Sequence, residues 1–328
     1  MNVLVTGGTG FLGARLIPAL VRHGHSVFAL TRSASSWEAL HQMGAVPVAG
    51  DLAGHAPLSL PAIDATAHAA AHFRFAGARK PYWRTNVAGT AALLNAAENA
   101  GAKLFVHISA AGIVMDDRGS PVRQADERSR TYLESFSAYI ASKAQGEALV
   151  LNANKPGFRT IALRPPAIWG PGDVFSRELP RLIASGQFAF IDRGDYPCVT
   201  CHVDNVVEAV LCALTRGTGG HAYFINDPHT QTFRAFVGMI AQAHGVSIDT
   251  LRSLPYPLAF RLGQVMEWFA AARSSKSDPP LSRSMVRMIG REFTTCDSAA
   301  RAELGYVGTT SLAAGVARYQ AGQGPTPA

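Results

Sequence analysis

The feature that most constrains the fold of this chain is a glycine-rich segment that directly follows an apolar strand. Residues 3–6 read as a buried strand, and a helix is predicted over residues 11–22. The glycines between them fit both G-x-x-G-x-x-G and G-x-G-x-x-G. Glycine lets the backbone approach a pyrophosphate, which the positive end of a helix attracts. Because no Gly-Lys-Ser/Thr closes the motif, Gly7, Thr9, Gly10 and Gly13 predict a dinucleotide-binding turn and exclude a P-loop.

The first half of the chain alternates short apolar runs with amphipathic segments. Strands are expected over residues 3–6, 26–30, 45–49, 65–69, 104–109 and 159–163, and the clearest helices over residues 11–22, 82–99 and 137–152. Parallel strands need crossover connections, and right-handed crossovers give a doubly wound sheet. The fold class is therefore α/β, with a parallel-sheet Rossmann fold at its centre.

A change of composition after residue 165 predicts a second lobe. The segment is rich in proline and glycine and carries aromatic residues, of which Trp169 and Phe175 are candidates for the wall of an apolar substrate pocket. A strand and helix over residues 199–214 are expected to return to the main sheet, and the chain after residue 233 is mostly helical. The predicted NAD(P)-binding domain is thus residues 1–165 plus about 198–225. Residues 166–197 and 226–328 form a smaller, discontinuous, mostly helical C-terminal substrate lobe.

The end of the second strand bears on the choice between NAD and NADP. NAD-binding folds place an Asp or Glu there to bind the ribose hydroxyls, but this chain reads Ala-Leu-Thr-Arg. Arg32 can bind a phosphate instead, so NADP is favoured over NAD. Asp51 and Leu52 close the third strand, where a carboxylate can accept a hydrogen bond from adenine, although Asp51 would equally cap a turn.

A tyrosine and a lysine four residues apart are the strongest catalytic candidates. Tyr139 and Lys143 share one face of the helix predicted over residues 137–152, which follows the fifth strand. Ligands bind at this edge of open α/β sheets. A free phenol has a pKa near 10, so acid-base work at neutral pH needs a nearby positive charge, which Lys143 and an oxidised nicotinamide would supply.

Together these motifs resemble the extended short-chain dehydrogenases/reductases, which belong to the NAD-dependent epimerase/dehydratase superfamily. Residues 164–173, 202–205 and 300–306 are similar to the 3-beta-hydroxysteroid dehydrogenase branch, which acts on hydroxyl and keto groups of sterol-like and other hydrophobic substrates. The resemblance implies further cofactor contacts. They are Phe11 and Leu12 at the pyrophosphate, Ala69, Ala70 and Ala71 near the ribose and nicotinamide, Pro166 and Ile168 at the nicotinamide, and Asn86 beside the cofactor.

One segment departs from the family pattern. The family usually places a Ser/Thr pair at the end of the fifth strand, and the second member binds the substrate carbonyl; here the sequence is Ser109-Ala110. Successive strand residues point to opposite faces, so Ser109 replaces the missing hydroxyl only if the strand end is bulged or already turning. Ser109 is the third catalytic candidate on that condition.

Charge and cysteine content exclude several other classes. The net charge of +7 comes from basic residues that are spread along the chain without aromatic interleaving, so no nucleic-acid partner is expected. The pattern Cys198-x-x-Cys201-His202 matches a haem-attachment motif, but no export signal precedes it, and no metal is expected. Without an export signal or an apolar run long enough to span a membrane, a cytoplasmic location is expected.

A predicted helix over residues 257–272 carries an apolar stripe. Leu258, Leu262, Val265, Met266 and Phe269 lie on one side of it. Such a stripe most often packs on the protein core or a partner subunit. A mobile lid over an apolar substrate and weak association with a membrane surface stay open, the latter because Arg273, Lys276 and Arg283 follow.

The leading functional hypothesis is NAD(P)-dependent hydride transfer to or from a secondary alcohol or ketone of a hydrophobic, sterol-like or long-chain keto substrate. A nucleotide-sugar epimerase or dehydratase is a second hypothesis within the same superfamily. A nicotinamide-sensing binding protein with weak catalysis is a third, which Ala110 motivates. A homodimer is expected by analogy with the family alone.

Overall fold

A seven-stranded, fully parallel sheet forms the centre of the computed structural model, which describes residues 1–272 and 278–322. Its strand order is β12-β7-β5-β4-β1-β2-β3. The strands are β1 (Asn2–Thr6), β2 (Ser26–Thr31), β3 (Ala45–Ala49), β4 (Ala65–His68), β5 (Leu104–Ile108), β7 (Arg159–Arg164) and β12 (His221–Phe224). Six of them are the strands that the sequence predicts, and the doubly wound α/β fold is confirmed.

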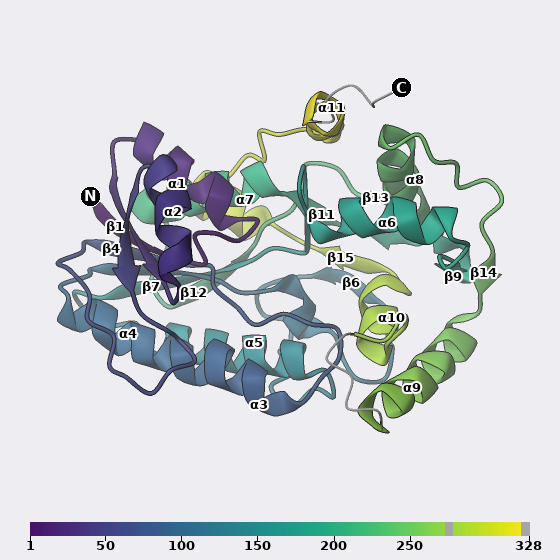
Figure 1. Ribbon diagram of the computed structural model, residues 1–328, viewed down its shortest axis with the longest axis horizontal. Coiled ribbons are helices and arrows are strands. Elements are labelled where there is room, and N and C mark those ends of the chain that lie inside the picture. Colours follow the sequence, from purple (N-terminus) through teal and green to yellow (C-terminus); the bar gives the residue numbers. More distant parts are fainter. Residues whose placement is uncertain (273–277, 323–328) are drawn as a thin grey trace.

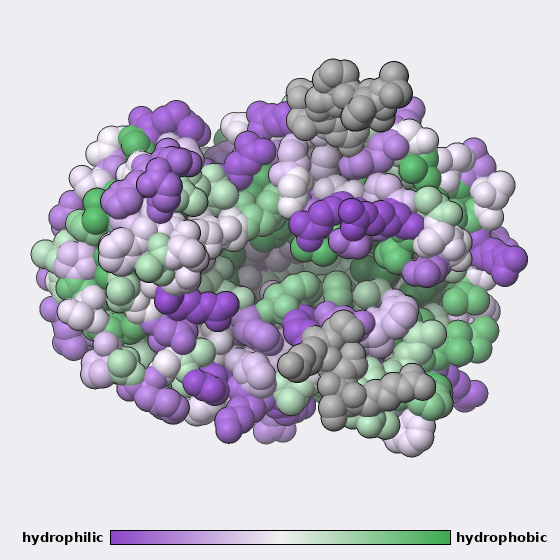
Figure 2. Space-filling model, viewed as in Figure 1, coloured by the Kyte–Doolittle hydropathy of each residue, from purple (hydrophilic) through white to green (hydrophobic). Residues whose placement is uncertain are grey.

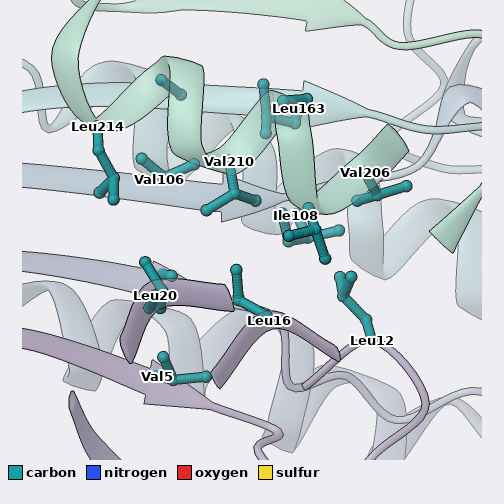
Figure 3. Packing of buried hydrophobic residues seen from close by; sticks show 14 of the residues in the cluster. Val5, Leu12, Leu16, Leu20, Val106, Ile108, Leu163, Val206, Val210 and Leu214 are labelled. Carbon is teal, nitrogen blue, oxygen red and sulfur yellow. The ribbon is translucent and has the colours of Figure 1, made fainter. Parts of the chain in front are cut away.

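Helices cover both faces of this sheet (Figure 1). One face carries α1 (Gly13–Arg22) and α7 (Val203–Thr215), and the other carries α4 (Gly89–Asn99) and α5 (Ala138–Asn152). Figure 3 shows side chains of α1 and α7 meeting those of the strands, such as Val5 and Val106. Because both faces are covered, neighbouring strand residues such as Leu4 and Val5 are both buried, in different clusters. The sheet is therefore a rigid platform for the loops at its carboxyl edge.

Shorter elements complete this part of the molecule. They are η1 (Ala34–Ser36), α2 (Trp37–Gln42), α3 (Arg79–Tyr82) and the π-helical turn η2 (Trp83–Ala88). The helix expected over residues 82–99 is thus a succession of α3, η2 and α4. A buried ion pair, Arg164 with Glu147 at 2.7 Å, fastens α5 to β7. Such a pair is costly to break, because either partner alone would leave a buried charge.

The second lobe is built around a small mixed sheet with the order β13-β10-β15-β6. Its strands are β6 (Val122–Ala125), β10 (Pro197–Cys198), β13 (Gln231–Thr232) and β15 (Phe293–Thr295). Two further strand pairs lie outside this sheet: β8 (Ala167–Trp169) with β11 (Thr200–His202), and β9 (Phe190–Ile191) with β14 (Ser253–Leu254). The helical elements are η3 (Ala111–Val114), α6 (Val174–Ala184), η4 (Asp192–Gly194), α8 (Phe233–Ala243), α9 (Tyr256–Ala272), α10 (Arg283–Ile289), η5 (Ala300–Leu304) and α11 (Leu312–Gly322). Figure 2 shows a recess between the two lobes with apolar residues on much of its visible floor.

One expectation about this lobe needs correction, and two further connections add to the description. The strand near residue 200, β11, pairs with β8 and not with the main sheet, although α7 does pack on that sheet. β6 comes from within residues 1–165 but pairs with β15. Ala300, Leu304 and Tyr306 pack in the core under α1 and α7, because their apolar side chains fill the space beside α7. β6 and η5 thus connect the two lobes, and the domain boundaries stay a prediction.

The apolar stripe of α9 is exposed and does not pack on the main sheet. Leu258, Leu262, Val265 and Met266 all face away from the protein, and the buried positions of α9 are Tyr256, Ala259 and Gly263. Arg273 and Lys276 lie outside the described residues. Within the described ranges, no helix combines the length and the apolar character needed to cross a membrane.

Candidate active site

The glycine turn lies between β1 and α1 and is too tight to admit side chains. Gly7 has φ of +72°, a conformation that favours glycine. A Cβ added to Gly13 would lie 2.6 Å from the Cα of Gly8 and would overlap the carbonyl oxygen of Gly7. Within the described residues no side chain caps α1 at Leu12, and its first turn holds no acidic residue. The turn therefore offers free N–H groups and the positive end of a helix, which fit a pyrophosphate.

The residues of this turn that are expected to contact the cofactor differ in their exposure. Thr9 and Gly10 are exposed, Phe11 is half-buried, and the side chain of Leu12 lies in the core. Leu12 can therefore meet a phosphate only through its backbone. The chain after β4 lies directly over the turn, since a Cβ on Gly7 would be 2.9 Å from the nitrogen of Ala70. Ala69 and Ala70 are thus next to the glycine turn, and contacts of Ala69, Ala70 and Ala71 with the ribose and nicotinamide stay a prediction.

A chain of buried hydrogen bonds, absent from the sequence reasoning, holds residue 70 in place. The Ala70 N–H donates to Thr6 Oγ1 at 3.0 Å, and Thr6 Oγ1 lies 2.7 Å from His68 Nδ1. His68 Nε2 lies 2.9 Å from Thr90 Oγ1, which donates to the carbonyl oxygen of Asn86. Burial lowers the pKa of His68 to about 3, so the ring is neutral: its Nε2–H donates to Thr90 Oγ1, and its Nδ1 accepts from the Thr6 hydroxyl.

The residues proposed for the adenosine side are partly engaged elsewhere. Arg32 follows the end of β2, is exposed, and makes no ion pair with any described residue. Asp51 is exposed and accepts a hydrogen bond from the Ala53 N–H at 3.0 Å, so it does cap a turn. Leu52 packs closely against α4: a Cβ added to Gly89 would lie 3.0 Å from the Cβ of Leu52.

Asn86 lies in the π-helical turn η2 and joins three segments. Its Oδ1 accepts from the His72 N–H at 2.7 Å, and its Nδ2 donates to the His72 carbonyl at 3.0 Å and to Ser142 Oγ at 2.9 Å. A buried amide with all of these partners fixes the loop after β4 against α5. Asn86 therefore positions the residues around the site, and it does so from a π-helical turn, an element that is frequent at functional sites.

Tyr139 and Lys143 lie one turn apart on α5, beside the end of β5. Burial raises the pKa of Tyr139 to about 12 and lowers the pKa of Lys143 to about 8, with Glu147 partly opposing the second shift. Lys143 Nζ donates to the Ile108 carbonyl at 2.6 Å and lies 3.4 Å from His107 Nε2. His107 was not among the candidates. Burial lowers its pKa well below the usual value, so it is neutral and its Nε2 can accept a hydrogen bond from the lysine.

The segment after β5 places Ala110 in the apolar cluster beside Tyr139. Ala110 is extended and belongs to the apolar cluster against which Tyr139 packs. Ser109 donates its N–H to the Leu163 carbonyl at 2.7 Å, and its buried hydroxyl has no hydrogen-bond partner among residues 1–272 and 278–322. A role for Ser109 as the substrate-binding hydroxyl stays a prediction.

Two phenylalanine rings from the loop after β4 lie near Tyr139. The ring of Phe73 meets that of Tyr139 edge to face, with 4.7 Å between centroids, and Phe75 packs on Phe73 at 5.0 Å. Asp278 holds this loop by accepting from the N–H groups of Phe75 and Ala76 at 3.1 Å. The surroundings of the phenol are therefore apolar, and they come from a segment that sequence motifs did not mark.

The expected nicotinamide contacts and the expected pocket residues after β7 differ in their burial. Pro166 and Ile168 are half-buried just after β7. Trp169 is only 1% exposed and donates Nε1–H to Asp227 at 2.6 Å, so it supports the lobe, and its place in the wall of a substrate pocket stays a prediction. Phe175 is half-buried and stacks on Phe236. Across the described chain, no cluster of three or more His, Cys, Asp or Glu side chains could hold a metal ion, and Cys198 and Cys201 are buried thiols.

Lys143→Met is expected to stabilise the free protein by about 2 kcal/mol near neutral pH. Burial costs the charged lysine more than the lost hydrogen bond to Ile108 contributes. This advantage is full below pH 8 and disappears as the pH rises to 10.5, because the unfolded wild-type lysine then releases its proton as well. Urea unfolding across this pH range measures it. The exposed control Lys103→Met should change stability by less than about 0.5 kcal/mol, and a less stable Lys143→Met protein at neutral pH would contradict the argument.

A doubly wound sheet with a glycine turn after β1 and a Tyr/Lys pair beyond β5 defines a short-chain dehydrogenase/reductase of the extended kind. The particular family follows from comparison. The chain belongs to the 3-beta hydroxysteroid dehydrogenase/isomerase family, whose sequence model matches residues 4–256. It is therefore an NAD(P)-dependent oxidoreductase.

Relatives and solved structures agree with this assignment. The 4-hydroxy-2-methyl-3-oxo-4-farnesyl-3,4-dihydroquinoline-1-oxide ketoreductase of Stigmatella aurantiaca is 36% identical, covering 100% of this chain and 99% of the relative. The 2-alkyl-3-oxoalkanoate reductase of Stenotrophomonas maltophilia (strain K279a) is 32% identical, covering 98% and 99%. The crystal structure of a double mutant of the dTDP-glucose 4,6-dehydratase DesIV from Streptomyces venezuelae, with NAD bound, superposes with a TM-score of 0.75 at 22% identity, covering 98% and 96%. That last likeness concerns the fold alone.

Proposed function

We propose that this protein reduces, or in reverse forms, a ketone on a lipophilic substrate, with Tyr139 as the proton donor and Lys143 as its electrostatic partner. The observation that carries the proposal is the placement of both residues on α5, beside the carboxyl end of β5 and under the aromatic ring of Phe73. A nicotinamide nucleotide, when bound, supplies or accepts the hydride.

The chain's own residues have distinct tasks in this reaction. The glycine turn and the N-terminus of α1 hold the pyrophosphate. Tyr139, whose pKa burial raises, is a neutral phenol at physiological pH and can give its proton to the ketone oxygen. Lys143 carries positive charge below pH 8 and stabilises the phenolate that remains. In the opposite direction the same charge helps Tyr139 to take a proton from the alcohol.

The proposed substrate is a 3-oxo compound that carries a long alkyl or prenyl chain. One relative is named for a 3-oxo compound with a farnesyl group and another for 2-alkyl-3-oxoalkanoates, and the apolar loop of Phe73 and Phe75 beside Tyr139 suits an apolar chain. Sterol-like ketones are the next class. The test is NADPH consumption with a panel of 2-alkyl-3-oxoalkanoates, prenylated ketones and steroid ketones. Turnover of nucleotide sugars without net redox change would favour epimerase chemistry, and cofactor binding without turnover of any compound would favour a sensor.

The proposed preference for NADP rests on Arg32. Its exposed guanidinium follows β2 without an ion-pair partner in the described chain and can bind a 2′-phosphate. Arg32→Ala is expected to weaken NADPH binding about tenfold and to leave NADH binding unchanged, as measured by calorimetric titration. The exposed control Arg118→Ala should alter neither. Equal losses for both nucleotides would refute a role in selecting the phosphate.

A further inference from the structure

Two buried histidines lie side by side in the main sheet. The strand register places Thr6 of β1 beside His68 of β4, and His68 beside His107 of β5. The centroids of the two histidine rings are 5.1 Å apart, and neither histidine is more than 1% exposed. A buried polar ring is costly unless its nitrogens find hydrogen-bond partners, so the partners of each ring indicate its role.

The hydrogen bonds of His107 differ from those of His68. Both ring nitrogens of His68 are bonded, to Thr6 and Thr90, which explains that ring as part of the fold. The Nδ1 of His107 has no partner in the part of the chain that the structure describes, and its Nε2 lies 3.4 Å from Lys143 Nζ. A leucine would fill this space without leaving a buried N–H unpaired. The contact with Lys143 is therefore what a histidine adds at this position.

The charges of the two groups fix the direction of their hydrogen bond. Burial and the nearby charge of Lys143 keep the pKa of His107 well below its usual value, so its ring is neutral. The pKa of Lys143 is about 8, so the lysine is charged at neutral pH. An ammonium only donates, so His107 Nε2 accepts and the ring proton lies on Nδ1. A second N–H of Lys143 goes to the Ile108 carbonyl at 2.6 Å, so consecutive residues of β5 bind two of the three N–H groups.

Within the described residues, no carboxylate binds this ammonium. Glu147 lies one turn further along α5 and raises the pKa of Lys143, but both of its oxygens accept from Arg164 of β7. The other titratable groups close to the pair are His68 of β4, which is neutral, and Tyr139 of α5, which is a neutral phenol. The ammonium therefore depends on two uncharged acceptors, the histidine ring and the carbonyl.

A lysine needs fixed acceptors because its side chain is flexible. Four methylene groups let the charge occupy many positions, and a second fixed acceptor restricts it. We propose that His107 is a positioning residue, whose Nε2 holds the ammonium of Lys143 near the carboxyl end of β5, one helical turn from Tyr139. The contact itself is independent of any reaction, whereas its value for proton transfer rests on the function proposed above.

Loss of this acceptor is expected to lower the pKa of Lys143. The charged form would keep only the Ile108 carbonyl, whereas the neutral amine loses little. A hydrogen bond of 3.4 Å to a charged group corresponds to about one pH unit, which is about tenfold in the ratio of ammonium to amine. Because the proposed reaction needs the charged lysine, the high-pH limb of kcat should move to lower pH by the same amount.

The pKa of Lys143 in the free protein tests the contact without cofactor or substrate. Lysine labelled with ¹³C at Cε is titrated by NMR, and the Lys143 signal is the one that Lys143→Met removes. The wild-type pKa should be about 8, and His107→Leu should lower it by about one pH unit. His107→Gln should restore the wild-type value, because its amide oxygen can reach the position of Nε2.

Thr66→Val is the matched control for these variants. Thr66 lies on β4, is fully buried, and its hydroxyl likewise has no hydrogen-bond partner in the described chain. The change removes a buried polar group from the same sheet and should leave the pKa of Lys143 unchanged. His107→Met fills the space with a more flexible side chain and repeats the test if the leucine variant does not fold. Thermal unfolding checks the fold of each variant.

The pH dependence of kcat connects the contact to catalysis. In NADPH-driven ketone reduction, the high-pH limb of His107→Leu should lie about one pH unit below that of the wild type. In His107→Gln the limb should return to the wild-type position. A loss of stability alone would lower the amount of folded enzyme and would not restore the limb in the glutamine variant.

Three outcomes would contradict a positioning role for His107. They are an unchanged lysine pKa in the folded leucine or methionine variant, a folded His107→Gln protein whose lysine pKa stays low, and an equal fall of that pKa in Thr66→Val. A lowered lysine pKa in a protein that reduces no ketone would leave the contact standing and count against the proposed function. The two proposals are therefore tested separately.

Discussion

Replacing Tyr139 with phenylalanine is expected to lower kcat for ketone reduction about 10³-fold. The substitution removes only the hydroxyl, and the ring keeps its edge-to-face contact with Phe73. Without that hydroxyl, no group on α5 can give a proton to the ketone oxygen, because Lys143 is engaged with the Ile108 carbonyl. Single-turnover NADPH oxidation measures the loss, and calorimetry should find NADPH affinity within about twofold of the wild type.

Tyr132→Phe is the matched control for this experiment. It removes a phenolic hydroxyl from a half-buried tyrosine in the segment that leads to α5, and the side chain of this tyrosine lies beside Arg130. It should keep wild-type kcat. A Tyr139→Phe protein that retains more than about a tenth of the activity would show that another donor works, and Ser109 would be the first to examine.

Gly13→Ala is expected to abolish detectable NAD(P) binding and to destabilise the protein by about 3 kcal/mol. The added methyl would overlap the Gly7 carbonyl and lie 2.6 Å from the Cα of Gly8, and neither is a side chain that can turn away. Either the glycine turn opens or α1 moves away from β1. Both changes would displace the N–H groups that face the pyrophosphate. Calorimetric titration with NADPH and urea unfolding measure the two effects.

Gly238→Ala separates this effect from the general cost of replacing glycine. Gly238 lies within α8, and a Cβ there would meet only the Cδ1 of Ile248 at 3.0 Å, which is the end of a flexible side chain. Because alanine favours helix, this control should be neutral or more stable by up to about 1 kcal/mol. Normal NADPH affinity in Gly13→Ala would mean that the cofactor does not lie against this turn.

The main sheet was predictable because its signals are local. Strands such as β3 (residues 45–49) are apolar runs bounded by glycine, and the glycine turn fixes where the first helix begins. β6 and β15 were not predictable. Each has at most four residues without clear alternation, and their pairing joins Val122 to Phe293, which no local pattern reveals.

The candidate site shows the same division. Tyr139 and Lys143 stand out by spacing and by their position after the fifth strand. His107, His68 and Phe73 carry no motif, and only the register of β4 beside β5 and the course of the following loop bring them to the site. The stripe on α9 was read correctly as apolar, but a helical pattern cannot tell which side the rest of the chain will cover.

The pairing of β6 with β15 has a consequence for biosynthesis. β6 can pair only after β15, about 170 residues later in the chain, has been synthesised. The main sheet likewise lacks β12 until residue 224 has been synthesised. During translation, β7 therefore lacks its neighbour β12, and β6 lacks its neighbour β15. The unpaired backbone groups of both strands can pair with other nascent chains. We therefore expect the chain to need chaperones during translation. We also expect a fragment that stops near residue 165 to aggregate.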